Sequence, residues 1–462
     1  MNGRTTRGDE YVLLAATSAG VILAPLNSTM LVVALPAIRD QYALGHVALG
    51  WLVSAYLITM AVAQPLGGQL GDHIGRRRLF RFGLLGFLVA SVAAALAPTY
   101  PLLLAFRLAQ GAAGALLIPN ARAMLREAVP VLRLGRVNGI NAAATLVAAA
   151  GGPLIGAWLL TTFSWRALFG VNVPMVLAAL AIERVLHYRD RPRAGGPAVD
   201  WLGTALFAGL FALVTQLLNS LRSTQVAATA AVAALTVGMG AVFTRQQLRV
   251  RTPAVGWDLL VHRPFVAATT HIMVTNLVMY TTLLAVPFFI AEVQQRGAGT
   301  AGLLLGGMSG LMAVLAPISG WVADVRGRRV PVLAGSAIAL VAAVLLLVGL
   351  SPNVSTSYLA AALALLGVGV GLGNASATAA IEAAPIARAG TAAGTSSTMR
   401  YVGSIVGAGV LSGVLAQGSA GAPAVDVFRL VFGVIVVCAA LALVAAVYIQ
   451  PFPPEAERPP AA

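Results

Sequence analysis

The sequence predicts an all-helical protein that crosses a membrane many times, and three observations lead to this fold class. First, 59% of the 462 residues are hydrophobic and only 10% are charged, whereas a soluble domain carries about 25% charged residues. Second, apolar runs longer than the roughly 18 residues that mark a membrane-spanning helix recur along the whole chain. Third, a short charged turn occurs twice between such runs, which indicates two related halves.

The apolar runs predict fourteen transmembrane helices, arranged as two six-helix bundles plus two extra central helices. Six spans precede the polar linker that begins at Arg189, two follow it, and six come after residue 264. An insertion of two helices leaves the orientation of the second half unchanged. The predicted spans are 11–37, 47–70, 79–98, 101–122, 137–161, 167–185, 201–220, 225–244, 265–291, 299–323, 330–350, 356–380, 390–416 and 427–450.

Four regions follow from this division. We expect an N-terminal bundle over residues 1–188, and cytoplasmic linkers with the two inserted helices over 189–264. The C-terminal bundle is expected over 265–450. The tail, 451–462, is rich in Pro and Glu and has no apolar run, so we expect it to be disordered.

The arginines predict the orientation. All 30 basic residues are Arg, and with a cytoplasmic N-terminus 23 of them fall on cytoplasmic ends and loops, 5 outside and 2 within spans. Because positively charged loops stay in the cytoplasm, we expect both termini there and the protein in the cell (inner) membrane. The net charge of +15 could indicate a nucleic-acid partner. We expect none, because the arginines lie in short loops between apolar segments.

Several kinds of chemistry find no support in the sequence. The single cysteine, Cys438, allows no disulfide within the chain and no multi-cysteine metal site. We find no phosphate-binding loop, no metal-ligand spacing and no nucleophile constellation. The sequence therefore predicts no enzyme, no cofactor and no metal.

The repeated turn is the most distinctive stretch of the chain. Residues 68–77 and 320–329 both read G-x-x-x-D-x-x-G-R-R. Glycine permits a tight turn between spans, and an Arg four residues after an Asp can pair with it. We interpret the two copies as a charge latch that holds one conformation. Ordinary positive loop charge explains the arginines but not the repeated Gly and Asp spacing. The predicted latch residues are Gly68, Asp72, Gly75, Arg76, Arg77, Glu127, Asp324, Gly327 and Arg328.

Five stretches, in the right order on the right spans, resemble the major facilitator superfamily, in particular its fourteen-helix drug:proton antiporter branch. The resemblance covers nearly the whole chain. The first charged turn is similar to the signature loop between the second and third helices of that superfamily. The other four stretches are Leu26-Asn27 to Pro36, Arg107-Leu-Ala-Gln110-Gly111, Gly152-Pro153-Leu-Ile-Gly156, and Trp165-Arg166 with Phe169, Asn172 and Pro174.

The resemblance implies a secondary active exporter that works by alternating access. It would export a small hydrophobic drug, antibiotic or natural product in exchange for protons, as a monomer in the lipid bilayer. A proton-independent facilitator or a lipid or metabolite exporter is the alternative. A non-transporting membrane sensor is a more distant one, because such a protein would lose gating features and both latch copies are complete.

One departure from the family pattern concerns proton coupling. The first-helix motif usually begins Leu-Asp, whereas here it is Leu26-Asn27, and Asn cannot titrate. No Asp or Glu lies deep within any predicted span. The usual proton site is thus missing, and the charge count favours neutral or anionic substrates as much as cations.

Arg107 lies about 9 Å into the fourth span from its outer end at 1.5 Å per residue. An Arg that faces lipid at such depth costs at least about 2.5 kcal/mol, so we expect it to face the bundle interior. Gln110 shares its helix face, and Asn27 falls at a similar depth. We interpret the three as a polar cluster for substrate or proton. The alternative is an Arg that reaches outward or binds backbone carbonyls.

The remaining candidates lie on later spans and at one helix bend. His271 titrates near neutral pH, so it is a candidate proton carrier, although a hydrogen-bonded structural histidine is equally expected. Asn276 and Tyr280 follow it on the same span as candidate cavity residues. Arg400 is mid-span, and Glu382 or a backbone carbonyl is an alternative partner for it. Pro153 kinks its helix, and the flanking Gly152 and Gly156 permit tight packing.

Overall fold

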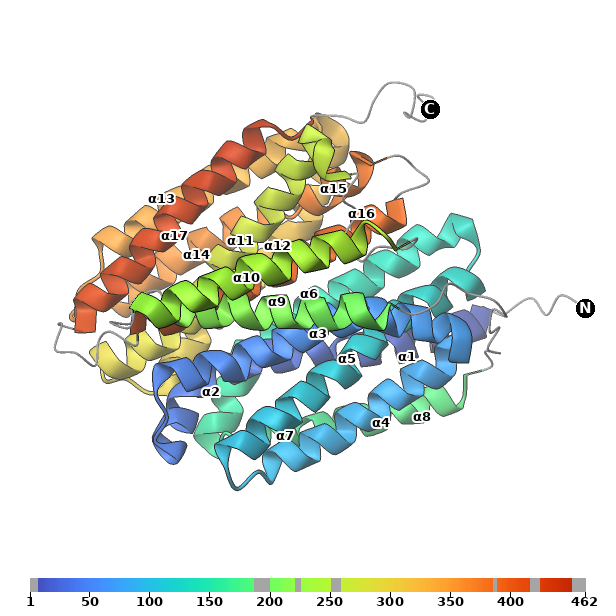
Figure 1. The fold of residues 1–462 in the computed structure, drawn as a ribbon, viewed down its shortest axis with the longest axis horizontal. Helices are drawn as coiled ribbons and strands as arrows, with labels where there is room; N and C mark the ends of the chain where they lie inside the picture. The colour runs from blue at the N-terminus through green and yellow to red at the C-terminus, as the bar shows by residue number, and fades with distance from the viewer. Residues whose placement is uncertain are drawn as a thin grey trace, which may run out of the picture. The chain divides into compact units, whose positions relative to one another are not determined.

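The computed structural model describes residues 7–186, 200–220, 226–250, 259–384, 389–415 and 424–450, and every regular element in these ranges is a helix (Figure 1). Fourteen helical segments among them are long and apolar enough to cross a membrane. The predicted all-helical class and the predicted number of spans are therefore confirmed. The segment 189–199 of the predicted linker and the predicted tail 451–462 lie outside the described residues.

The chain forms two compact units, and the first is built mainly from residues before position 215. Its first span consists of two helices in succession, and its sixth begins with a single short turn. The helices are α1 (Arg7–Val21), α2 (Leu23–Tyr42), α3 (His46–Ile74), α4 (Arg76–Ala95), α5 (Tyr100–Ala128), α6 (Val131–Thr162), α7 (Ala167–Gly170) and α8 (Asn172–Arg184).

The second unit is built mainly from residues after position 252. A π-helical turn, η2 (Phe289–Val293), extends its first long helix. The elements are η1 (Leu259–Val261), α11 (Arg263–Phe288), α12 (Ala298–Arg326), α13 (Arg329–Val348), α14 (Thr356–Gly373), α15 (Ser376–Glu382), α16 (Ala389–Leu415) and α17 (Ala424–Val447). The two remaining helices, α9 (Trp201–Ser220) and α10 (Val226–Gln247), contribute residues to both units.

Small residues bring the helices of each unit into close contact, as lipid-surrounded helices require. In the first unit, a Cβ on Gly67 of α3 would lie 3.1 Å from the carbonyl oxygen of Ala115 on α5. In the second unit, a Cβ on Gly335 of α13 would lie 2.5 Å from the carbonyl oxygen of Gly369 on α14. These pairs allow backbone to meet backbone, which positions the polar side chains described below.

The two copies of the charged turn end their helices in the same way. Gly75 follows α3 with φ of 111°, and Gly327 follows α12 with φ of 87°. Side chains other than hydrogen strain the backbone at such φ values. The next helix begins at Arg76 in the first copy and at Arg329 in the second, so each glycine reverses the chain within one or two residues.

Candidate functional site

The first unit holds a buried polar cluster centred on Arg107 of α5. Arg107 is only 1% exposed, so it does not reach outward. Its Nη1 donates to Oδ1 of Asn27 on α2 and, over 2.7 Å, to Oε1 of Gln110 one turn away. Gln110 Nε2 in turn donates to Ser91 Oγ on α4 over 2.8 Å. The structure thus brings together the three residues that the sequence analysis grouped, and adds Ser91.

Aromatic rings complete the surroundings of this arginine. Its guanidinium carbon lies 4.1 Å from the ring centre of Tyr56 on α3 and 5.9 Å from that of Phe169 on α7. A cation over an aromatic face gains about 2 kcal/mol when water is excluded. Tyr56 is itself held by the hydrogen bond that its hydroxyl donates to the carbonyl of Ala24 (3.1 Å). Ring faces and neutral dipoles therefore surround a fixed positive charge.

The acidic residues of the helices around this cluster lie at helix ends. Along α2, α3 and α5 they are Asp40, Asp72 and Glu127, and α4 has none. Asp40 is thirteen residues from Asn27 on α2, which is about 20 Å at 1.5 Å per residue. Along its own helix, Asn27 therefore has no carboxylate nearby.

The predicted helix-bend motif packs beside the same cluster. A Cβ on Gly156 of α6 would lie 2.7 Å from the carbonyl oxygen of Met30, and one on Gly152 would overlap Thr29 Oγ1. Thr29 and Met30 follow Asn27 on α2 by two and three residues. Pro153 lies inside α6 between the two glycines. The contact between α2 and α6 thus supports the segment that carries Asn27.

The second unit has an equivalent contact that the sequence analysis missed. Gly403 and Gly407 of α16 lie against α11, where a Cβ on Gly407 would be 2.9 Å from the carbonyl oxygen of Leu277. Gly403 would overlap the carbonyl of Met273 in the same way. The signal was the spacing of four between these glycines, which matches that between Gly152 and Gly156.

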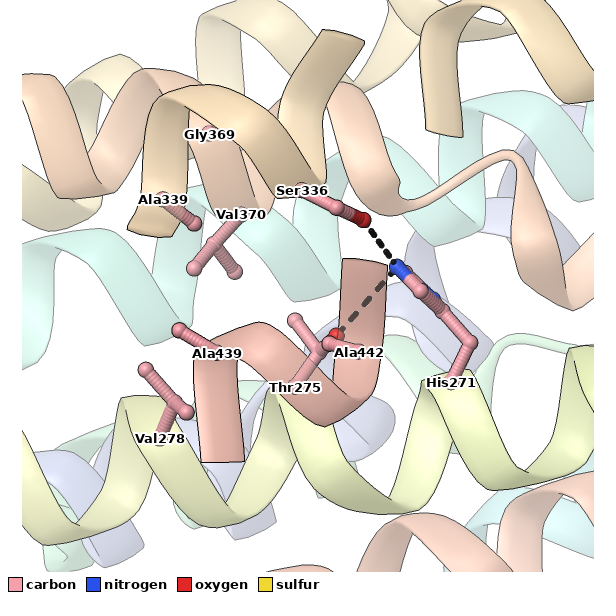
Figure 2. Close-up of a pocket in the computed structure, with 9 residues that line it drawn as sticks. All are labelled: His271, Thr275, Val278, Ser336, Ala339, Gly369, Val370, Ala439 and Ala442. Carbon is pink, nitrogen blue, oxygen red and sulfur yellow. Dashed lines mark hydrogen bonds between the residues drawn. The ribbon is translucent and has the colours of Figure 1, made fainter. Parts of the chain in front are cut away.

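His271 lies elsewhere in the second unit, on α11, and is 1% exposed. Its Nε2 is 2.9 Å from Ser336 Oγ on α13 and 3.5 Å from Thr275 Oγ1 one turn along α11. Both hydroxyls converge on this nitrogen beside a cavity of about 10 Å³ (Figure 2). The cavity lining is His271, Thr275, Val278, Ser336, Ala339, Gly369, Val370, Ala439 and Ala442.

The other predicted cavity residues of this unit are outside that lining. Asn276 is half-buried, and its Nδ2 donates to the carbonyl of Ile272 in its own helix over 2.9 Å. Tyr280 on α11 and Arg400 on α16 are also half-buried. The structure therefore does not place these three with His271.

Each charged turn forms an ion-pair cluster within its own unit. In the first, Arg76 pairs with Asp72 and donates from Nη1 to the carbonyl of Gly68 over 3.1 Å. Glu127, at the end of α5, lies 3.9 Å from Arg76 Nε. The predicted trio of Asp72, Arg76 and Glu127 is thus close together in the structure.

The second cluster has the same plan. Arg328 pairs with Asp324 at 2.5 Å and holds both carboxylate oxygens of Glu382, at 2.9 and 2.7 Å. These partners, Glu382 foremost, raise the pKa of the Arg328 guanidinium above its usual range. Sequence analysis offered Glu382 only as a partner for Arg400. The place of Glu127 at the C-terminal end of the fourth span could have identified it, since Glu382 ends the matching span.

Arg77 departs from the predicted latch and belongs to a separate clamp. With Arg81 on the same helix, α4, it binds Glu183 at the end of α8. Arg77 Nη2 donates to the carbonyl of Glu183 over 2.8 Å, and Arg81 donates to both carboxylate oxygens at 2.9 and 2.8 Å. The Glu183 side chain is 0% exposed. This clamp was missed, and its signal was an acidic residue at the C-terminal end of the sixth span.

Comparison with known proteins places this architecture among transporters. The family model described as Major Facilitator Superfamily matches residues 17–408 and 269–462. The uncharacterized MFS-type transporter YvkA of Bacillus subtilis is 31% identical over 87% of this chain and 91% of its own length. The tetracenomycin C resistance and export protein of Streptomyces glaucescens is 31% identical over 71% of this chain and 62% of its own length. The multidrug resistance protein Stp of Mycobacterium tuberculosis is 30% identical over 88% of this chain and 76% of its own length.

Two solved structures share the fold. A D-xylose-proton symporter aligns with a TM-score of 0.66 at 14% sequence identity. A POT family transporter in complex with 5-aminolevulinic acid aligns with a TM-score of 0.71 at 13% sequence identity. Each alignment covers 97% of this chain and 98% of the other. At such identities the likeness concerns the fold alone.

Proposed function

The chain belongs to the Major Facilitator Superfamily, so it is a multi-pass membrane transporter and not an enzyme, and we propose that it exports a hydrophobic drug, antibiotic or natural product in exchange for protons. Two relatives, a tetracenomycin C resistance and export protein and a multidrug resistance protein, support the direction and the substrate class. The mechanism would be alternating access, the general plan of transporters with repeated halves.

The observation that carries this proposal is the buried cluster of Arg107, Asn27 and Gln110. A charge buried this deeply is retained at a cost, and in transporters such residues mark substrate or ion pathways. Arg107 keeps a fixed positive charge, and Asn27 cannot neutralise it. Neutral or anionic substrates therefore fit this cluster better than cations do.

The proposal also includes the placement of the protein. The arginine distribution supports a cell (inner) membrane location with both termini cytoplasmic. In that orientation the ion-pair clusters at Arg76 and Arg328 lie at the cytoplasmic ends of their helices. There they would hold one conformation until the pairs separate. None of these features needs a second copy of the chain, so the proposal is for a monomer.

One alternative has a specific observation in its favour. Because Asn27 replaces the usual titratable residue, a proton-independent facilitator or metabolite exporter would need no other change in the first unit. It predicts substrate movement without proton movement.

The test is transport by the purified protein in proteoliposomes that contain a pH-sensitive dye, with neutral, anionic and cationic compounds. We expect substrate-dependent proton flux with neutral or anionic compounds. Arg107→Gln should raise the half-saturating concentration of an anionic substrate about 10–100-fold, since a hydrogen bond to a charged group contributes about 1.5–3 kcal/mol. The half-saturating concentration of neutral substrates should change less.

Arg429→Ala is the matched control, because Arg429 lies at the start of α17 and its side chain is 54% exposed. It should transport like the wild type. An unchanged half-saturating concentration of the anionic substrate in Arg107→Gln would contradict the proposed role of Arg107. Substrate movement without protons would favour the facilitator.

A further inference from the structure

The His271 cavity is a second polar site, far along the chain from Arg107 and wholly within the second unit. Apart from His271, Thr275 and Ser336, its lining is apolar or glycine. Figure 2 shows the imidazole entering from α11, with Ser336 reaching it from α13. A cavity of about 10 Å³ is near the lower limit for one water molecule, which is roughly 10–15 Å³.

The hydrogen bonds identify which imidazole nitrogen carries a proton. Ser336 Oγ donates its only hydrogen to the carbonyl of Val332 over 2.8 Å. It must therefore accept from His271 Nε2–H in the 2.9 Å contact between them. The lone pair of the neutral ring is then on Nδ1, which is buried and has no hydrogen-bond partner among the described residues.

No charged group lines this cavity. A proton on Nδ1 would create an imidazolium among neutral groups, and a buried charge is costly unless it is paired or hydrated. The titratable residues on α11 and on the elements packed around it lie outside the lining: Arg263, Tyr280, Glu292, Asp324, Arg326, Arg329, Tyr358, Glu382, Arg400, Tyr401, Asp426, Arg429 and Cys438.

We propose that His271 is the proton-binding residue of the transport cycle, and that it binds its proton only when α11 separates from α13 enough to admit water. In that step Nδ1 takes a proton from a hydronium ion: one O–H bond breaks, one N–H bond forms, and a water molecule is left. This inference rests on the proton exchange in the proposed function. It assigns that exchange to the second unit, where the family's first-helix carboxylate plays no part.

The geometry links protonation to helix movement. In the described state Nε2 is satisfied by Ser336, and the ring is enclosed by α13 and α14. Gly373 of α14 packs against the ring, since a Cβ at this position would lie 3.1 Å from the ring carbon Cε1, and Nδ1 is buried without a hydrogen-bond partner among the described residues. Hydration of Nδ1 therefore requires a different packing of these helices. A proton would bias the second unit toward that packing, which is the coupling that antiport needs.

The test separates proton coupling from substrate handling. His271→Gln keeps an amide donor for Ser336 but cannot bind a proton. Two assays are compared in proteoliposomes: substrate counterflow, which needs binding and alternating access only, and uphill transport driven by a pH gradient. We expect His271→Gln to retain counterflow but to lose uphill transport and substrate-evoked proton flux. Its net efflux should lose the pH dependence that histidine produces between about pH 5 and 8.

His262→Gln is the matched control, because His262 is an exposed histidine immediately before α11, and it should behave as the wild type. Proton flux and uphill transport that persist in His271→Gln would overturn the inference while leaving the proposed exporter intact. A wild type that moves substrate without protons would instead refute the proton exchange itself.

Two further variants decide the case in which His271→Gln loses counterflow as well. Ser336→Ala removes the acceptor of Nε2–H, and Thr275→Val removes the second hydroxyl at nearly constant shape. Both leave a titratable His271. We expect a shifted pH profile of uphill transport in each, with counterflow retained. An unchanged profile in both variants would overturn the inference.

Discussion

A single methyl group added to α6 tests whether the contact between α2 and α6 supports the Arg107 cluster. The change is Gly156→Ala. The added Cβ would lie 2.7 Å from the carbonyl oxygen of Met30 and 3.1 Å from its Cα. Ordinary carbon–oxygen contacts are about 3.3–3.6 Å, so α2 and α6 must separate by about half an ångström or more. Backbone atoms on both sides leave no flexible side chain to absorb this movement.

The same helix offers a control. Gly151→Ala would place its Cβ 3.6 Å from Ile155 Cδ1 and near nothing else. Both substitutions gain about 0.5–1 kcal/mol from the higher helix propensity of Ala, so this gain cancels in the comparison. Overpacking costs about 1–3 kcal/mol. Gly156→Ala should therefore be about 1–3 kcal/mol less stable than Gly151→Ala.

The assay is the free energy of unfolding of both purified variants under one denaturing condition, followed by substrate efflux in proteoliposomes. Because Met30 follows Asn27 by three residues, the displaced α2 should also alter the Asn27–Arg107 hydrogen bond. We expect reduced efflux for Gly156→Ala and wild-type efflux for Gly151→Ala. Equal stability and equal efflux for the two variants would refute this account of the contact.

Two further predictions concern the ion pairs. Glu183→Gln leaves Arg77 and Arg81 without their buried carboxylate and should lower the free energy of unfolding by about 3–5 kcal/mol. The control Asp426→Asn, at an ion pair whose two side chains are both half exposed, should change the free energy of unfolding by less than about 1 kcal/mol. Similar changes for both variants would contradict the clamp. Arg328→Lys cannot bind Glu382 through two parallel bonds, so it should alter the rate of transport at unchanged substrate affinity. Arg326→Lys, at an exposed position, should not, and a change in both would argue against a latch.

The sequence predicted those parts of the fold that depend on local pattern. Apolar runs identified all fourteen spans, because length and hydrophobicity decide where a helix can cross a bilayer. The pairing of Asp72 with Arg76 was predictable for the same reason, since the two residues lie four positions apart across the turn between α3 and α4. Each of these inferences needed only neighbouring residues.

The partners from distant spans were harder to predict. Glu183 and Arg81 are separated by 102 positions, and although Glu183 stands out as an acidic residue at a span end, its local sequence does not identify Arg81 as its partner. Ser336 is 65 positions from His271, and its role depends on how α13 packs on α11. Helix packing in lipid follows the shape of small residues, which sequence pattern alone does not convert into pairs. Asn27 and Arg107 were grouped only because their depths in the membrane agreed.

The distribution of these features between the units separates scaffold from chemistry. The glycine turns, the Asp–Arg–Glu clusters and the glycine contacts of α6 and α16 occur in both units, as repeated halves with the same helix packing would require. The polar interiors do not repeat. The helix α14 corresponds to α5, because each belongs to a span that ends in a carboxylate cluster, yet α14 contains no arginine that would match Arg107. Likewise, α2 contains no histidine that would match His271 on α11. A residue needed for the turns must be present twice, whereas a residue that binds one substrate or one proton need occur only once. On this ground we propose that Arg107 and His271 serve the chemistry of transport rather than its scaffold, so their substitution should alter transport more than stability.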